Sequence, residues 1–318
     1  MGTILVNGPQ SDGERRALLY DGAIFYFTPR PAVAALAEHA WDLIGESFGA
    51  LDPLTAQDAI SVEQFVEHLA ALKPRFTHSL RAKELLRDLL VDFGCDPEST
   101  YFDLPKLRIV THSGYLTAGL GYAYKPHRDI WYAAPNCQLN WWFPLVDIGP
   151  TNALAFHPQY WNVPVPNTSG GFDPYVWNAT GRKNAASFIK SDNRNHPTTA
   201  EPIPVDPQVR VVGPASSMLI FSAAQLHSTV PNTSGRTRFS VDFRTLSLDD
   251  LNAGRGAPDV DDTSTGTTLR DFLRASDFTP LDEDVVKRFD VGSSHDGVLV
   301  FRPPEGSDPP EHARQTKT

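Results

Sequence analysis

The spacing of apolar residues changes at Leu104, and this change constrains the fold more than any other feature of the sequence. Before Leu104, apolar residues recur every three or four positions in blocks long enough for helices. After it, they form short runs separated by Pro, Gly and Asn, which is typical of strands joined by turns. Helical stretches between most of these runs are lacking, so we expect an antiparallel sandwich or jelly roll and not a doubly wound parallel sheet. The expected strand runs are 107–110, 137–146, 153–156, 210–212, 218–222 and 239–246.

The segment before Leu104 is expected to support these strands with helices. Three blocks, 32–48, 61–72 and 79–93, carry helical spacing, and the second opens with a capping-box pattern that begins at Ser61. An aromatic-rich run at 18–27 alternates as a strand does. The fold class predicted from these patterns is mainly β with flanking α, a jelly-roll core buttressed by N-terminal helices.

With 318 residues, the chain can bury one large core, and we expect a single domain over 1–318. The stretch 158–204 interrupts the strand pattern and is rich in Asn, Pro, Gly and Thr, but its embedded aromatic residues favour a lid over disorder. The expected parts are a disordered leader at 1–16, a mostly helical support at 17–103, a core at 104–246 with the lid-like insertion at 158–204, a C-terminal helical extension at 247–301 and a disordered tail at 302–318.

Composition narrows the possible partners. The chain has 28 Lys and Arg against 38 Asp and Glu, a formal net charge of −10, and no basic cluster, which argues against nucleic acid and anionic membranes. No apolar run approaches the roughly 18 residues of a membrane span, and a signal-peptide pattern is lacking at the start, so the cytoplasm is the expected location. Two cysteines are too few for a disulfide framework or a Cys-rich zinc site. A small molecule is the expected partner of a monomer or homodimer.

A His and an Asp stand two residues apart in the segment 125–132, KPHRDIWY. Because side chains at i and i+2 of a strand share a face, His127 and Asp129 can aim a nitrogen and a carboxylate oxygen at one point. A further imidazole, His227, follows the apolar run 218–222 after a turn of small residues. Two imidazoles and one carboxylate are the ligand set of non-haem Fe(II) oxygenases. The sequence therefore nominates these three residues as metal ligands, while a His-x-Asp pair alone equally suits a structural hydrogen bond.

A possible carboxylate site follows the second His. Arg238 and Ser240 stand eleven and thirteen residues after His227, in a strand-like run. On a strand they share a face, where a guanidinium fork and a hydroxyl can bind one carboxylate together. The complete set has His127-x-Asp129 first, then His227, then Arg238-x-Ser240, each on or beside a strand-like run. It is a far more specific signal than His-x-Asp alone.

These five residues resemble the 2-oxoglutarate/Fe(II)-dependent oxygenases, and within them the phytanoyl-CoA dioxygenase-like branch. The similarity covers roughly 104–246, whereas the insertion and the C-terminal extension depart from the family, so family substrates are not carried over. Further segments that resemble pieces of this branch are QLNWWFPLVD at 138–147, TNALAF at 151–156 and His157-Pro158.

The resemblance implies a double-stranded β-helix, a cupin-like jelly roll, with Fe(II) held at one open end by the three nominated ligands. It implies that 2-oxoglutarate chelates the iron, that its far carboxylate pairs with Arg238 and Ser240, with Gln138 also assigned to the co-substrate, and that O2 takes the last position. The implied reaction is the hydroxylation of an unactivated C–H of a small organic molecule, of secondary-metabolite or amino-acid-derived type, with release of succinate and CO2. Asp129 favours hydroxylation over halogenation, because Ala or Gly there would open a halide site. Desaturation, ring closure and epimerisation share the same hydrogen abstraction and stay open.

Substrate contacts are expected from residues near the His-x-Asp motif and on the strand that follows it. The aromatic members of this set could equally be core residues, since alternation must send Trp141 and Trp142 to opposite faces. Arg108 could reach the co-substrate or an acidic substrate, or pair with a surface Asp. The candidates for the pocket wall are Tyr124, Trp131, Asn140, Trp142 and Arg108.

Two other functions are compatible with parts of this pattern. A cupin-like metalloenzyme, an isomerase or a dioxygenase independent of 2-oxoglutarate, would use the three ligands but would not need Arg238 and Ser240. A non-enzymatic β-sandwich binding module would have no reason to place His, Asp and His in a facial triad. His112 and His157, near strand ends, could contact the site or simply pack.

Overall fold

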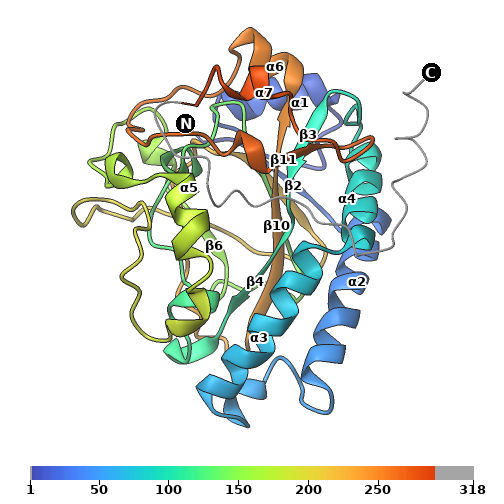
Figure 1. Ribbon diagram of the computed structural model, residues 1–318, viewed down its shortest axis with the longest axis vertical. Coiled ribbons are helices and arrows are strands. Elements are labelled where there is room, and N and C mark those ends of the chain that lie inside the picture. Colours follow the sequence, from blue (N-terminus) through green and yellow to red (C-terminus); the bar gives the residue numbers. More distant parts are fainter. Residues whose placement is uncertain (1, 291–318) are drawn as a thin grey trace.

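Two β-sheets form the centre of the molecule, a computed structural model that describes residues 2–290 (Figure 1). The strands are β1 (Ile4–Val6), β2 (Ile24–Phe27), β3 (Thr100–Asp103), β4 (Lys106–Val110), β5 (Leu139–Pro144), β6 (Leu154–Phe156), β7 (Val209–Val211), β8 (Met218–Ser222), β9 (His227–Thr229), β10 (Arg238–Ser247) and β11 (Phe272–Arg274). The larger, 8-stranded sheet has the order β1-β2-β8-β5-β10-β3-β11, with β4 also paired to β10, and the smaller, 3-stranded sheet has the order β7-β6-β9. Within the described residues, the named strands pair antiparallel except β1 with β2.

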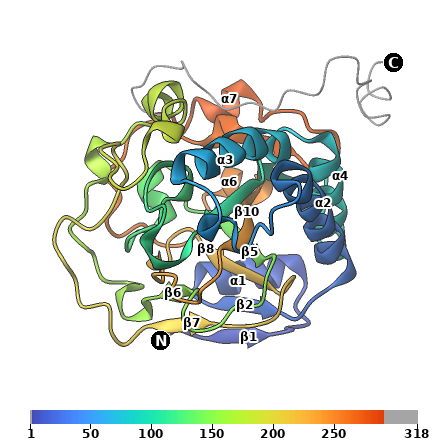
Figure 2. The same ribbon diagram turned by 90° about the horizontal axis from the view of Figure 1, so that it is seen from below.

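Helices cover one face of the larger sheet. The α-helices are α1 (Asp12–Tyr20), α2 (Pro31–Phe48), α3 (Val62–Thr77), α4 (Leu80–Asp92), α5 (Pro174–Val176), α6 (Leu248–Ala253) and α7 (Glu283–Val286). Helix α2 packs against both α3 and α4, and α3 packs against β4. In both views α2 and α4 lie on one side of β10, while the segment that contains α5 lies on the other (Figures 1 and 2). The sheet therefore separates a helix-covered core from a second, open face.

The alternation of β10 creates these two faces. Phe239, Val241 and Phe243 are fully buried in the core beneath α2–α4, where the Phe239 ring lies 5.8 Å from that of Trp41. The residues between them, beginning with Arg238, point to the opposite face. Each buried aromatic ring contributes about 1.5–3 kcal/mol by leaving water, so the register of β10 is strongly fixed. The polar side chains of this strand are consequently held on one face by the packing on the other.

The strand and helix patterns of the sequence are largely confirmed. Each of the six expected runs after Leu104 overlaps a strand, and the three helical blocks correspond to α2, α3 and α4. Trp141 and Trp142 do point to opposite faces, with Trp141 in the helix-covered core. Strand β3 and the short strand β9 lie outside the six runs that the pattern marked.

The N-terminal leader is ordered, and its expected disorder at 1–16 is wrong. Strand β1 pairs parallel with β2, and α1 begins with a capping box in which Ser11 and Glu14 bind each other's backbone N–H groups. Helix α1 continues to Tyr20, so the expected strand at 18–27 is confined to β2. The capping box and the sheet pairing offset the conformational entropy that an ordered terminus loses.

The described part of the C-terminal extension 247–301 is only partly helical, which corrects the expectation of a helical extension there. After α6, residues 269–271 form a 3-10 turn that is followed by β11, because Phe272, Leu273 and Arg274 pair with β3 and complete the sheet edge. Helix α7 spans a single turn. Residues 291–301 and the expected tail at 302–318 lie outside the described residues.

The insertion 158–204 contains no strand of the two sheets and consists of short helical turns and loops on the open face (Figure 1). Helix α5 and the π-helical turn Trp177–Gly181 form its central part. Within residues 2–290, no helix has the length and apolar character needed to cross a membrane.

Candidate metal centre

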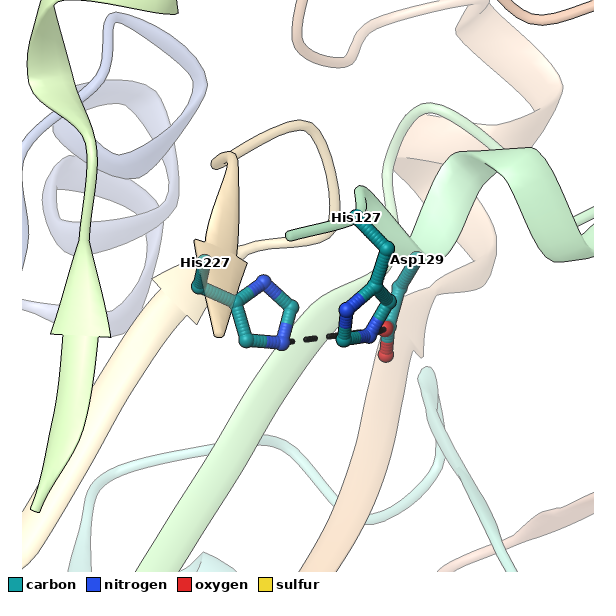
Figure 3. A group of neighbouring side chains, drawn as sticks. All are labelled: His127, Asp129 and His227. Atoms are coloured by element: carbon teal, nitrogen blue, oxygen red, sulfur yellow. Dashed lines mark ion pairs between the residues drawn. The ribbon is translucent and has the colours of Figure 1, made fainter. Parts of the chain in front are cut away.

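His127, Asp129 and His227 come together on the open face although they belong to two distant segments (Figure 3). His127 and His227 exchange two backbone hydrogen bonds of 3.0 Å in an isolated β-bridge. Asp129 opens the 3-10 turn Asp129–Tyr132, and its N–H donates to the Ala223 carbonyl at 2.9 Å. The expected strand at this motif is therefore a bridge followed by a turn. Hydrogen bonds to the backbone of Ala223 and His227, and not a regular strand, set the position of the motif.

The three side chains converge on one point. The Nε2 atoms of His127 and His227 lie 3.2 Å and 3.9 Å from Oδ1 of Asp129, and one ligand atom from each residue lies within 4.8 Å of the others. All three residues are buried. Two imidazole nitrogens and one carboxylate oxygen at these distances could hold a metal ion and would leave coordination positions free.

Both imidazoles are oriented by backbone carbonyls at Nδ1. Nδ1 of His127 lies 2.8 Å from the Lys125 carbonyl, and Nδ1 of His227 lies 3.0 Å from the Gln225 carbonyl. Because a carbonyl only accepts, each Nδ1 carries the hydrogen of the neutral ring, which leaves the Nε2 lone pair facing Asp129. Burial, with smaller effects of its neighbours, lowers the pKa of His227 to about 3. This ring is therefore neutral at physiological pH and can bind a metal without losing a proton.

Asp129 is kept ionised by a partner that the sequence reading missed. Burial alone would raise the pKa of Asp129, but Arg244, together with the two imidazoles, lowers it below its ordinary value. Arg244 reaches Oδ2 of Asp129 through Nε at 3.4 Å and Nη2 at 3.3 Å, which leaves Oδ1 facing the imidazoles. Arg244 lies on the same face of β10 as Arg238, so strand alternation was the signal that could have identified it.

Arg238 retains unused donors for an anion. Its Nη1 donates to the carbonyls of Asn152 at 2.7 Å and Ala153 at 3.3 Å, whereas its buried Nε has no hydrogen-bond partner among the described residues. Burial lowers the pKa of Arg238 to about 10, so it stays charged at neutral pH. The Oγ atom of Ser240, two residues along the same face, is also buried without a partner among the described residues. Such unpaired groups are costly unless a ligand binds them, and a carboxylate fits this donor set. Arg238 lines the cavity beside the candidate metal ligands, whereas the fully buried Ser240 does not.

A cavity of about 510 Å³ contains the three candidate ligands in its wall. Its wall is formed by residues of β4, β5, β10 and α3 and by the insertion. Its volume lies in the range of small-molecule sites. Of the residues nominated for co-substrate or substrate, it is lined by Tyr124, Gln138, Asn140, Trp142, Arg108 and Arg238.

Two of these residues have partners that refine their expected roles. Arg108 forms a bidentate ion pair with Asp242, at 2.5 Å and 3.1 Å, and donates to the Tyr124 hydroxyl at 2.9 Å. It does pair with an Asp, but inside the cavity and not on the outer surface. Gln138 donates to Oδ1 of Asn140 at 3.1 Å, so these two polar groups are already paired.

Trp131 is not part of the cavity wall, which corrects its nomination. It is fully buried in a separate cluster with Ile130 and Leu226, and its Nε1 donates to Asp261 at 2.7 Å. The 3-10 turn that begins at Asp129 directs this ring away from the metal ligands, where a continuing strand would have kept it on their face. Among the other histidines, His157 is buried between Val205 and Ser228 and packs outside the cavity.

A closed series of ring contacts lies in the cavity wall and includes His127. The insertion supplies three of its members, which the sequence reading missed because this irregular segment has no periodicity to interpret. The successive ring-centroid distances are His127–Tyr132 5.7 Å, Tyr132–Phe172 5.0 Å, Phe172–Trp177 6.1 Å, Trp177–His196 4.6 Å, His196–Tyr122 4.0 Å, Tyr122–Tyr124 4.9 Å and Tyr124–His127 5.1 Å. We call these seven residues the aromatic cluster of the cavity.

No protein-family model and no curated protein matches the chain. Among solved structures, the chain is similar to EvdO2 from Micromonospora carbonacea var. aurantiaca, at 14% identity and a TM-score of 0.36, over 55% of this chain and 62% of EvdO2. It is also similar to the non-heme monooxygenase ThoJ, at 15% identity and a TM-score of 0.40, over 85% of this chain and 81% of ThoJ. A third is the epimerase SnoN in complex with Fe3+, alpha ketoglutarate and nogalamycin RO, at 18% identity and a TM-score of 0.37, over 79% of this chain and 98% of SnoN. Because these similarities are low, the case for a function rests on the geometry of the site.

Proposed function

We propose that this protein is an Fe(II)- and 2-oxoglutarate-dependent oxygenase that oxidises a C–H bond of a small organic molecule. The observation that carries the proposal is the geometry of the three candidate ligands. Two imidazoles, each fixed by a carbonyl at Nδ1, direct Nε2 toward a carboxylate that Arg244 holds from its other side. A facial set of two His and one carboxylate suits Fe(II) and leaves three positions for the co-substrate and O2.

Arg238 supports the co-substrate assignment. Its unpaired Nε and the unpaired Ser240 hydroxyl lie on one face of β10, and Arg238 lines the same cavity as the ligands. We assign them to the far carboxylate of 2-oxoglutarate, with Gln138 nearby in the wall. A cupin-like enzyme independent of 2-oxoglutarate would leave the buried donors of Arg238 unpaired, which is energetically unfavourable.

Iron, when bound with 2-oxoglutarate and O2, supplies the oxidising chemistry, and succinate and CO2 are the co-products. The chain provides an anionic third ligand in Asp129, which occupies the position that a halide would need, so hydroxylation is the proposed outcome. The cavity wall excludes bulk water and orients the substrate over the ligands. We further propose that the two sheets are those of a double-stranded β-helix, that the chain belongs near the phytanoyl-CoA dioxygenase-like branch, and that the insertion acts as a lid.

The test is turnover of the co-substrate. The full-length protein is incubated with Fe(II), O2 and 2-oxoglutarate labelled at C1, and labelled CO2 and succinate are measured with and without candidate substrates. We expect slow succinate formation that requires Fe(II), is lost in His227→Ala and rises with a true substrate. Stoichiometric iron binding with no succinate under any condition would contradict the proposal. Location in the cytoplasm and a monomeric or homodimeric state remain predictions from the sequence.

A further inference from the structure

The insertion contributes one guanidinium to the cavity wall that forms no hydrogen bond with any residue in the range 2–290. Arg182 follows the turn Trp177–Gly181, and its backbone N–H donates to the Trp177 carbonyl at 3.0 Å. Its Nη1 is buried and lacks a hydrogen-bond partner among those residues. The ion pair between Nη2 and Oδ2 of Asp271 measures 3.7 Å, which is too long for a hydrogen bond. A buried N–H left unpaired is costly, so this side chain is a candidate for binding a ligand.

Several other cations of the cavity wall are held by neighbours, whereas Arg238, whose Nε is also unpaired among the described residues, is assigned to the co-substrate. Arg108 pairs with Asp242, and Arg194 pairs with Asp192 at 2.5 Å. Lys73 donates to the Leu120 carbonyl at 2.8 Å. Lys and Arg outnumber Asp two to one in the cavity wall, in a chain whose formal net charge is −10. The surplus of positive charge is therefore concentrated at this site.

Arg182 lines the same cavity as the candidate metal ligands. Burial lowers its pKa, as do Arg244 and Arg108, while Asp271 and Asp103 act in the opposite direction. Because a guanidinium does not lose its proton in proteins, Arg182 is a fixed positive charge. Arg244, one of the charges that act on it, contacts the candidate ligand Asp129 directly. Arg182 and the candidate metal ligands thus line the same cavity, and Arg244 acts electrostatically on both Arg182 and Asp129.

The same turn supplies an apolar surface. The carbonyl of Trp177 accepts the hydrogen bond from the backbone N–H of Arg182. Trp177 belongs to the aromatic cluster of the cavity, which also includes the candidate ligand His127. A molecule bound at Arg182 would place its apolar part against this aromatic cluster, because the faces of aromatic side chains favour flat, apolar groups.

We propose that Arg182 binds a carboxylate of the substrate, and that the substrate is a small organic acid with an apolar, ring-containing body. The reaction at the metal rests on the function proposed above, but the binding of the acid does not. A planar guanidinium with free N–H groups matches a carboxylate. The nearby Asp103 and Asp271 disfavour a dianion such as a phosphate ester, because they would repel its second charge.

The test uses 3-phenylpropanoate and its neutral amide as probes of the metal-free, full-length protein, with tryptophan fluorescence reporting on Trp142 and Trp177 in the wall. We expect the wild-type protein to bind the acid about tenfold more tightly than the amide. Arg182→Gln should remove this preference and leave amide binding unchanged, and Arg182→Lys should keep part of it. Arg210→Gln, an exposed Arg of β7, is the matched control and should behave as wild type.

Three results would overturn the proposal. The first is wild-type protein without the preference for the acid, and the second is Arg182→Gln protein that retains it. The third is loss of the preference in Arg238→Gln instead, because the probe would then occupy the co-substrate site. A separate anaerobic titration with Fe(II) and 2-oxoglutarate distinguishes this inference from the proposed function. Arg182→Gln should keep the wild-type affinity for 2-oxoglutarate. If wild-type protein fails to bind 2-oxoglutarate, the proposed function fails while the acid site stands.

Discussion

Arg244 donates to Oδ2 of Asp129 at 3.3 Å, on the side of the carboxylate opposite to the two imidazoles. This contact fixes which oxygen is left for a metal and keeps the carboxylate charged in a buried site. Arg244 is thus a positioning residue for the candidate ligand.

Replacing Arg244 with Met should weaken metal binding about 10–100-fold, the range typical of lost outer partners of metal ligands. Arg244→Lys should restore part of the affinity, because it retains the charge but not the two-pronged contact. Equilibrium dialysis with Fe(II) under anaerobic conditions measures the change, and circular dichroism checks that each variant is folded. A folded Arg244→Met protein with wild-type metal affinity would show that the contact is incidental.

Metal removal should lower thermal stability. The candidate ligands come from residues 127–129 and from residue 227, so they converge only in the folded chain and a bound ion stabilises that state. At a metal concentration of 100 times Kd, the gain is about 2.7 kcal/mol in the free energy of unfolding. A chelator should reverse the gain in the wild-type protein and have no effect on His227→Ala. An unchanged melting temperature on addition of saturating Fe(II) or Mn(II) to the wild-type protein would contradict this prediction.

Neighbouring tryptophans should differ in their contributions to stability. Trp141 is buried in the helix-covered core and donates to Thr245 at 2.8 Å, whereas Trp142 lines the cavity beneath Arg238. Trp141→Ala should cost about 3–5 kcal/mol in the free energy of unfolding. Trp142→Ala should cost less, because the Trp142 indole donates to no residue in the range 2–290, whereas loss of Trp141 breaks its hydrogen bond to Thr245. Urea unfolding compares the two variants, and equal losses would mean that the two faces of β5 are packed alike.

The pH dependence of stability should carry a contribution from Lys73. Burial, reinforced by Arg108, lowers the pKa of Lys73 to about 7 in the folded state, from an ordinary value of 10.5. Between these two values the unfolded chain binds more protons, so this group makes stability rise with pH from about 7 to about 10. Lys73→Met should remove that rise, and its stabilising effect relative to wild type should shrink as the pH increases. Urea unfolding from pH 7 to 9.5 tests this, with the exposed Lys287→Met as control. Parallel pH profiles for wild type and Lys73→Met would refute it.

Periodicity predicted the framework of this protein because packing obeys it. The two-residue alternation of β10 and β5 correctly separated core side chains from the face that carries Arg238. The same rule applied to Arg244 would have identified the partner of Asp129. The structure does bring His127, Asp129 and His227 together, but through a bridge and a turn and not through the strand that motivated the prediction.

Irregular backbone accounts for what the sequence did not reveal. Trp131 was misplaced because the turn at Asp129 ends the alternation, and the contribution of Trp177 and His196 was missed because the insertion has no repeating spacing. Residues 4–20 are ordered because β1 pairs with β2, which the sequence does not reveal, although the capping box at Ser11 and Glu14 is visible in it. Tertiary contacts decide these positions, and local pattern does not encode them.

The central claim is that the three ligands and Arg238 bind Fe(II) and 2-oxoglutarate together. An anaerobic titration of the metal-free protein with Fe(II) and then 2-oxoglutarate, followed by visible absorption, tests it most directly, because a 2-oxo acid chelated to Fe(II) has a weak charge-transfer band. We predict that the band appears in the wild-type protein and requires a far higher concentration of 2-oxoglutarate in Arg238→Ala. Iron binding without the band would contradict the co-substrate assignment, and absence of iron binding would show that His127 and Asp129 are structural.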